Sequence, residues 1–109
     1  MIKVTFYESP NGLVKKMRFE GHAGYADHGH DIVCSAVSML FINTVNSIEK
    51  LTSCKFKMDE DNKSNRYTVT FADEYGDDVK ILIDSLKLGL DTVVGEYGRE
   101  YLLITLKEV

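Results

Sequence analysis

The chain has 109 residues, of which 44% are hydrophobic and 28% charged, as in an ordinary soluble globular protein. Its 13 basic and 17 acidic residues give a net charge of −4, which argues against a general nucleic-acid binder because such proteins neutralise phosphates. The opening MIKVTFYESP contains no apolar stretch long enough for an export signal, and we predict no membrane-spanning segment. We therefore expect a single domain over residues 1–109 in the cytoplasm, with no nucleic acid or membrane as a partner.

The N-terminal part of the chain has the pattern of a β-hairpin. Residues 2–8 alternate between apolar and polar side chains, as a half-buried strand does, and residues 13–20 alternate in the same way. The sequence SPNG at 9–12 supplies residues that favour turns. These features together predict two antiparallel strands joined by a tight connection.

Two later segments carry apolar residues at helical spacing. Residues 34–52 are apolar nearly all round in their first half, which predicts a central and well-covered helix. Residues 77–97 place an apolar residue every three or four positions and are followed by Gly98 as a cap. Gly89 costs stability inside this helix, so its presence indicates close backbone packing there.

The remaining segments complete an α+β pattern. Phe56 and Met58 mark a short strand, 59–65 is polar enough to be a loop, and Tyr67 begins the next apolar alternation. A final strand is predicted over 101–107. The order ββαββαβ predicts two helices packed on a mostly antiparallel sheet.

All three histidines and one of the two cysteines fall between residues 21 and 34, a stretch that fits neither the strand nor the helix period. Its glycines favour an irregular loop between a strand and a helix. Cys34 is then expected in the first turn of the helix, with Asp31 as the N-cap. Free amides and the helix dipole at that position favour thiolate over thiol, and a nearby histidine can act as base and acid.

The residues alone leave three interpretations of this segment open. Cys34 can be a small buried residue at the start of a helix, with the histidines in bland loop positions. His22, His28, His30 and Cys34 are also competent zinc ligands, although their spacing, H-x5-H-x-H-x3-C, matches no paired-ligand pattern. The third interpretation is a cysteine nucleophile with a histidine base. Without an export signal, both Cys34 and Cys54 are expected as thiols.

The sequence also resembles a known family. The residues GHA at 21–23, followed by G-x-D-I-V-C-S-A-V-S at 29–38, resemble the ribosomal-processing cysteine protease (Prp) family. The resemblance extends to the opening MIKVTF, to NSIEKL at 46–51 and to the second helix, and so covers essentially the whole chain. Between residues 55 and 76 only the pattern of apolar residues matches.

The resemblance implies a cysteine protease whose catalytic pair is His22 and Cys34 and which needs no cofactor. It implies that the substrate is large-subunit ribosomal protein twenty-seven, whose short N-terminal extension is removed by cleavage after paired aromatic residues. It also implies a homodimer. His28 and His30 lie where the family has no known requirement, so they are left out of the predicted site.

Three further residues are expected to support the catalytic pair. Gly21 is predicted to act as a hinge that brings His22 toward Cys34 when substrate orders the loop. Asp31 is expected to cap the helix or orient the loop, and Ser38 lies one helical turn beyond Cys34 on the same face. The alternatives to the protease are a non-enzymatic module that binds a ribosomal protein tail and a small zinc-binding protein.

Overall fold

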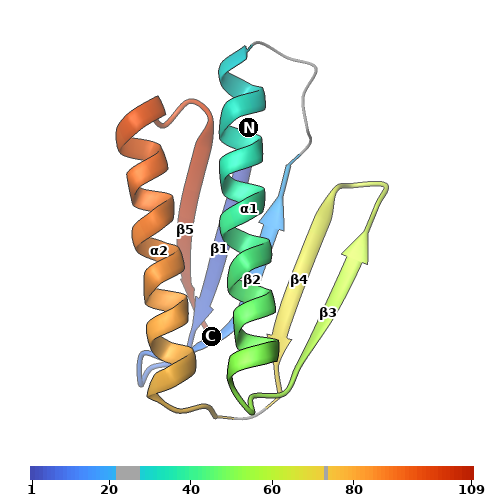
Figure 1. Ribbon diagram of the computed structural model, residues 1–109, viewed down its shortest axis with the longest axis vertical. Coiled ribbons are helices and arrows are strands. Elements are labelled where there is room, and N and C mark those ends of the chain that lie inside the picture. The colour runs from blue at the N-terminus through green and yellow to red at the C-terminus, as the bar shows by residue number, and fades with distance from the viewer. Residues whose placement is uncertain (22–27, 73) are drawn as a thin grey trace.

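The fold was analysed in a computed structural model that describes residues 1–21, 28–72 and 74–109, with the side chains of 28–31 left out of the description. Five strands and two helices follow one another in the predicted order ββαββαβ (Figure 1). Their bounds are β1 Ile2–Glu8, β2 Val14–Glu20, α1 His28–Leu51, β3 Phe56–Asp61, β4 Arg66–Phe71, α2 Asp77–Tyr97 and β5 Leu102–Glu108.

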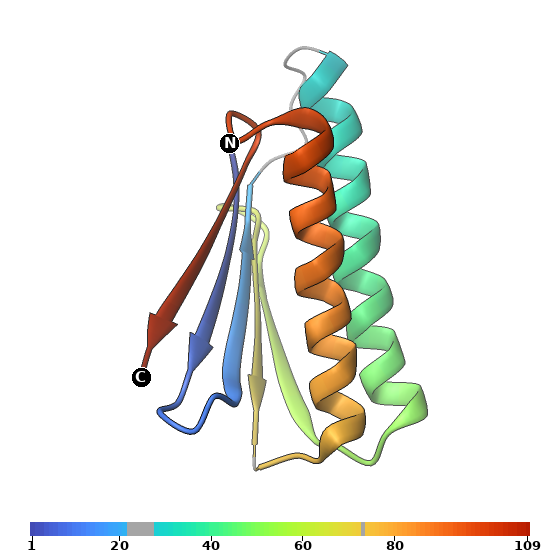
Figure 2. The same cartoon turned by 90° about the vertical axis from the view of Figure 1, so that its left-hand side faces the viewer.

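The strands form one sheet in the order β3-β4-β2-β1-β5. Three of the four neighbouring pairs are antiparallel, and only β1 and β5 run parallel, with Ile2 opposite Leu102. Both helices cover the same face of the sheet, and no helix of the described residues lies on the opposite face (Figure 2). The predicted α+β architecture, with two helices on a mostly antiparallel sheet, is confirmed.

The core lies between the sheet and the two helices. Ile2, Val4 and Phe6 alternate along β1 and are buried, as are Met17 and Phe19 on β2. Because successive strand residues point to opposite faces, the polar residues between them lie on the face without helices. The alternation of apolar and polar residues in the sequence therefore identified the buried face of this hairpin correctly.

The first helix begins earlier than predicted. Helix α1 starts at His28 instead of near residue 34, and it already contains the buried Val33. Val33, Val37 and Phe41 follow one another at four-residue spacing, so the buried stripe of the helix includes a residue before the predicted start. Asp31 therefore lies inside the first turn and is not an N-cap, and Cys34 is in the second turn.

The prediction that α1 is well covered on all sides is wrong. Met39 is 66% exposed and Ile42 51% exposed, although both belong to the apolar first half of the helix. In a two-layer fold, one side of each helix packs on the sheet and the opposite side faces solvent. These two apolar side chains are therefore on the surface.

A second prediction about α1 also needs correction. By length and composition, residues 32–51 are long and apolar enough to cross a membrane, contrary to the expectation of no such segment. Val37, Val45 and Ile48 on this helix are nevertheless buried in the core against the sheet. A core helix of a globular fold meets the same criterion.

Helix α2 agrees with its sequence pattern. Gly98 adopts a φ of 98° and donates its N–H to the carbonyl of Val94 at 2.8 Å, so it ends the helix as predicted. A Cβ built on Gly89 would lie 3.0 Å from Leu40 Cδ2, which confirms close packing of the two helices at this glycine.

Strand β3 is longer than predicted. It continues to Asp61 because Asp59 pairs with Thr68 and Asp61 with Arg66 on β4, although these residues were expected in a loop. Its side chains are mostly exposed because β3 is an edge strand. Backbone pairing overrides the low strand propensity of this acidic segment.

Candidate active site

Cys34 lies in the second turn of α1, where its half-buried side chain packs against the edge of the core. It is a free thiol. Residues four apart lie on one side of a helix, so Ser38 and Ile42 follow Cys34 along the same face of α1. Ser38 therefore lies on the same helix face as Cys34, one turn further along, as predicted.

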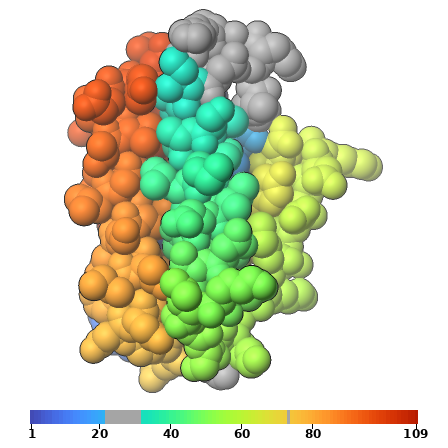
Figure 3. Space-filling view, viewed as in Figure 1, coloured from blue at the N-terminus to red at the C-terminus, as the bar shows by residue number. Residues whose placement is uncertain are grey.

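A mostly apolar cavity of about 300 Å³ opens along this face of α1. Three of the residues lining it are aromatic, with the Phe19 ring 5.5 Å from Phe41 and 6.0 Å from Tyr67. The full lining is Phe19, Ser38, Phe41, Ile42, Met58, Glu60 and Tyr67. It lies where α1 faces the β3–β4 hairpin, and Figure 3 shows these two parts on the same side of the molecule.

The early start of α1 changes the expected environment of the Cys34 thiol. Only the first four N–H groups of a helix are free, and Cys34 is about 9 Å along the axis from His28. Its own N–H bonds within the helix in regular α geometry. Cys34 therefore lies one turn beyond the free amides of the first turn, and its own amide is not available as an oxyanion donor.

Gly21 is held firmly at the end of β2. Its N–H donates to the carbonyl of Asn65 at 3.2 Å, and its φ is 153°. A Cβ at this position would lie 3.0 Å from Ile2 Cγ1 and 3.1 Å from Ile2 Cα. Only glycine fits this approach without displacing β1, so the backbone just before His22 has a defined position.

Several predicted site residues lie outside the described part of the chain. His22 falls in the segment 22–27, and the side chains of His28, His30 and Asp31 are likewise not described. The predicted closure of the loop also concerns these residues. Among the described residues, no group of three or more His, Cys, Asp or Glu side chains could hold a metal ion, but most ligands of the zinc alternative are not among them.

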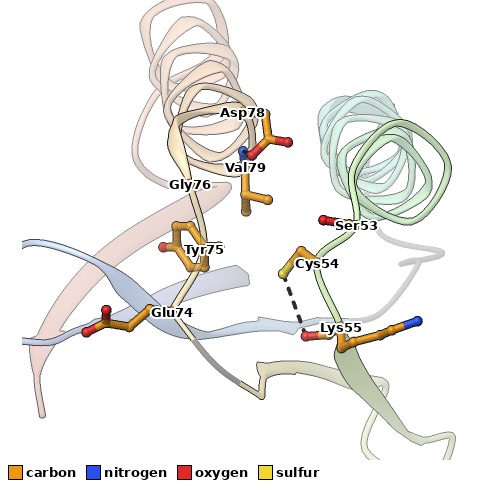
Figure 4. A pocket seen from close by; sticks show the side chains of 8 residues that line it. All are labelled: Ser53, Cys54, Lys55, Glu74, Tyr75, Gly76, Asp78 and Val79. Atoms are coloured by element: carbon orange, nitrogen blue, oxygen red, sulfur yellow. Dashed lines mark hydrogen bonds between the residues drawn. The ribbon is translucent and has the colours of Figure 1, made fainter.

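The second cysteine has different surroundings at the other end of α1. Cys54 lines a polar cavity of about 200 Å³ together with Glu74, Tyr75 and Asp78 (Figure 4). Its Sγ lies 3.6 Å from the carbonyl of Lys55. Burial raises the pKa of Tyr75 to about 12, and its hydroxyl donates to the carbonyl of Val14 at 2.8 Å.

The two cysteines cannot join in a disulfide. Leu51 is 17 positions after Cys34 on α1, which corresponds to about 26 Å along the helix. A disulfide needs Cα atoms within about 7 Å. Neither cysteine forms a disulfide in the described part of the chain, as the sequence predicted.

Comparisons with known proteins identify the family of this chain. The family model described as "Cysteine protease Prp" matches residues 1–102. The chain belongs to the Prp family of cysteine proteases. The protein is thus a cysteine protease, and the family resemblance noted in the sequence is confirmed.

Named relatives and solved structures agree with this assignment. The ribosomal processing cysteine protease Prp of Staphylococcus aureus strain Mu50 is 29% identical over 98 residues, which cover 90% of this chain and 92% of that protein. The Bacillus subtilis Prp is 24% identical over 101 residues, or 89% and 90% of the two chains. A crystal structure of S. aureus Prp with a covalently linked product peptide has a TM-score of 0.86 and 28% identity, covering 98% of this chain and 100% of that one.

A second S. aureus Prp structure contains a substrate peptide and has a TM-score of 0.84 at 27% identity, with both chains fully covered. This Prp fold therefore accommodates a peptide and a covalent product in a relative of nearly equal length.

Sequence reasoning missed the cavity. Phe19, Phe41 and Tyr67 were placed only as apolar strand or helix positions, because nothing in a single sequence shows that they meet around a space. One indication was available: Met39 and Ile42 are apolar residues off the buried stripe of α1. Large exposed apolar side chains close to a candidate nucleophile suggest a surface that binds an apolar ligand.

Proposed function

We propose that this protease removes a short N-terminal extension from large-subunit ribosomal protein twenty-seven, with Cys34 as nucleophile and His22 as general base and acid. The observation that carries the proposal is the position of the Cys34 thiol, which lies on the same face of α1 as Ser38 and Ile42, two residues that line the apolar cavity. The relatives named as ribosomal processing proteases support this substrate class.

In the proposed reaction, the His22 imidazole takes the proton of the Cys34 thiol, and the sulfur attacks the scissile carbonyl carbon. The C–N bond then breaks as the imidazolium gives its proton to the leaving amine, and a thioester remains. Water, deprotonated by His22, attacks the thioester carbon. The carboxylic acid product leaves, and the thiol is restored.

The position of Gly21 supports the pairing of His22 with Cys34. Gly21 is fixed at the end of β2, and the first turns of α1 lie at that same end of the molecule (Figure 1). His22 is its direct neighbour in sequence, and Cys34 is one turn below the first turn of α1. The backbone that leads to His22 is thus anchored near the helix segment that carries the nucleophile.

The oxyanion needs donors other than the amide of Cys34. We propose that other backbone N–H groups supply them once a peptide is bound. Asp31 and Ser38 act as positioning residues, Asp31 for the segment before the helix and Ser38 for the substrate backbone at the mouth of the cavity.

The cavity suits an aromatic side chain of the substrate. Its lining rings, Phe19, Phe41 and Tyr67, offer edges and faces with which another ring can pack. The exposed Met39 and Ile42 extend this apolar surface along α1. Cleavage after paired aromatic residues fits this surface, with one ring in the cavity and the other over the exposed side of the helix.

Peptides that span the extension of the ribosomal protein test the proposal directly. Incubation followed by mass spectrometry is expected to show one cut, on the carboxyl side of the aromatic pair. A matched peptide with alanines in place of both aromatic residues is expected to be cleaved at least about tenfold more slowly, because it loses the buried rings. Equal cleavage of both peptides contradicts the assigned role of the cavity.

We also propose that the protein is cytoplasmic and forms a homodimer. Cys34 and Cys54 form no disulfide in the described part of the chain, which supports a reducing compartment. Ile81 and Leu88, seven residues apart on α2, are each more than two-thirds exposed and offer an apolar strip for a second copy. Sedimentation velocity of the wild type and of Leu88→Glu tests this, with a monomeric variant as the expected result.

A further inference from the structure

The sheet face without helices carries its charges in an ordered way. Strand register places one residue from each strand in a line across this face: Lys57, Thr70, Lys16, Tyr7 and Lys107. We name these five residues the basic row. It contains three lysines and no acidic residue, although the whole chain has a net charge of −4.

The neighbouring lines across the same face are different. The next line contains one base, Arg18, and one acid, Asp59. The line beyond it contains two bases, Arg66 and Lys3, and two acids, Asp61 and Glu20. Neither of these lines has a net charge, so the excess positive charge of this face lies in the basic row, at one end of the strands.

Three cations surround one aromatic ring in this band. Lys16 Nζ lies 4.4 Å from the centroid of the Tyr7 ring, the guanidinium carbon of Arg18 lies 5.7 Å away, and Lys107 Nζ 6.0 Å away. Among the described residues, none of the three forms an ion pair with a carboxylate. The Nε atom of Arg18 is also covered by protein without a hydrogen-bond partner. Like charges gathered this closely repel one another, so an anion bound here would be stabilised.

We propose that the basic row is a binding surface for single-stranded RNA. Strands in a sheet are about 4.8 Å apart, so Lys57, Lys16 and Lys107, each two strands from the next, are spaced by about 10 Å across the face. That line of cations can follow an extended phosphate backbone, with the Tyr7 ring available to stack on a base.

RNA fits this surface better than an acidic peptide does. Thr70, the member of the row between Lys57 and Lys16, has a short and exposed side chain, so the face is low between these two lysines. An open sheet face that combines exposed aromatic and basic side chains is a recurrent platform for unpaired bases. An acidic peptide would use the lysines but would leave the ring without a stacking partner.

Fluorescence anisotropy with a labelled oligouridine of about 12 nucleotides tests the proposal on the intact protein. Binding is expected at about 50 mM KCl and is expected to weaken as salt rises. The double variant Lys16→Gln/Lys107→Gln is expected to bind about tenfold more weakly, with a salt slope shallower by about 1.4. Tyr7→Ala is expected to weaken binding about tenfold without changing the slope.

A matched control removes two lysines from the helices instead. The variant Lys50→Gln/Lys80→Gln has the same net charge as the first double variant but leaves the basic row intact. Its RNA affinity is expected to stay within about twofold of wild type. Because the basic row lies on the opposite side of the sheet from Cys34, both double variants are expected to cleave peptides normally (Figure 2).

Three results would overturn the proposal. The first is no binding at low salt, and the second is equal weakening by the two double variants. The third is displacement of the oligouridine by oligoglutamate of equal charge as effectively as by unlabelled RNA, which would assign the face to an acidic protein. Cleavage of the peptide is measured separately, so failure here is distinguishable from failure of the proposed substrate.

Discussion

The two cysteines of this protein lie at opposite ends of α1 and illustrate how surroundings decide what a thiol can do. Cys34 lies on a helix face that continues into an apolar, aromatic-lined cavity, and the anchored Gly21 precedes the histidine proposed as its base. Cys54 lies beside Glu74, Tyr75 and Asp78, with no histidine among the residues that line its cavity. Similar burial of the two side chains thus says little about reactivity.

The largest expected difference between the two cysteines is in catalysis. Cys34→Ala is expected to lower the turnover of the cognate peptide by more than about a thousandfold because it removes the nucleophile. Cys54→Ala is expected to retain nearly full activity. Thermal unfolding of both variants provides the control, since each is expected to remain folded. A Cys34→Ala protein with near-normal turnover would rule out the proposed mechanism.

Alkylation separates the same two thiols chemically. Modification of Cys34 is expected to abolish activity in the wild type and in Cys54→Ala, while a chelator is expected to leave the rate unchanged. Peptide mapping by mass spectrometry identifies which thiol has reacted. Loss of activity in chelator that zinc restores would instead support the site built from His22, His28, His30 and Cys34.

The next largest effect is expected from substitution of Gly21, whose backbone is hydrogen-bonded at the end of β2. Gly21→Ala is expected to lower the free energy of unfolding by about 1–3 kcal/mol, because a Cβ would meet Ile2 and the positive φ adds strain. It is also expected to lower turnover by displacing the backbone before His22. Chemical denaturation and peptide kinetics measure the two effects.

Gly12 provides a matched control for Gly21. Its φ is 84°, but a Cβ there would have no heavy atom within 4 Å. Gly12→Ala is therefore expected to show only the backbone strain and to leave turnover unchanged. Equal effects of the two substitutions on turnover would show that the contact with Ile2 does not position His22.

The smallest expected effect is on the pH dependence of stability and involves Tyr75, which lines the cavity next to Cys54. Burial raises the pKa of Tyr75 to about 12 from an ordinary value near 10. The unfolded chain therefore loses this proton more readily, and the stability associated with it is present below pH 10 and lost as the pH rises toward 12. Unfolding midpoints between pH 9 and 12 are expected to fall less steeply for Tyr75→Phe than for the wild type. Identical slopes would contradict the burial of this hydroxyl.

The fold was largely predictable because the spacing of apolar residues is regular in most of its strands and helices. Alternation in β1 and β2 identified the buried face, and the stripe of α2 identified both its length and its cap at Gly98. The start of α1 was not predictable in the same way, since His28, Gly29 and His30 have weak helix propensity. The burial of Val33, a tertiary effect, decides it.

The candidate site was only partly predictable. Cys34 and Ser38 could be placed on one helix face from their spacing, and the protease assignment came from a sequence motif. The cavity depends on Phe19 and Tyr67 meeting across β2 and β4, a contact between residues 48 positions apart in the chain. Such a contact requires the strand order, which local patterns do not contain.

The pairing of β1 with β5 has a consequence for how the protein is made. The first strand to be synthesised lies between β2 and β5, and its partner Leu102 is 100 residues later in the chain. Until residues 102–108 leave the translating ribosome, one edge of β1 has no partner and the buried Leu102 is missing from the core. Pairing between distant segments forms slowly because the long intervening loop must close first. We therefore expect that nascent chains without β5 lack protease activity, so that the enzyme becomes active only after β5 has been synthesised.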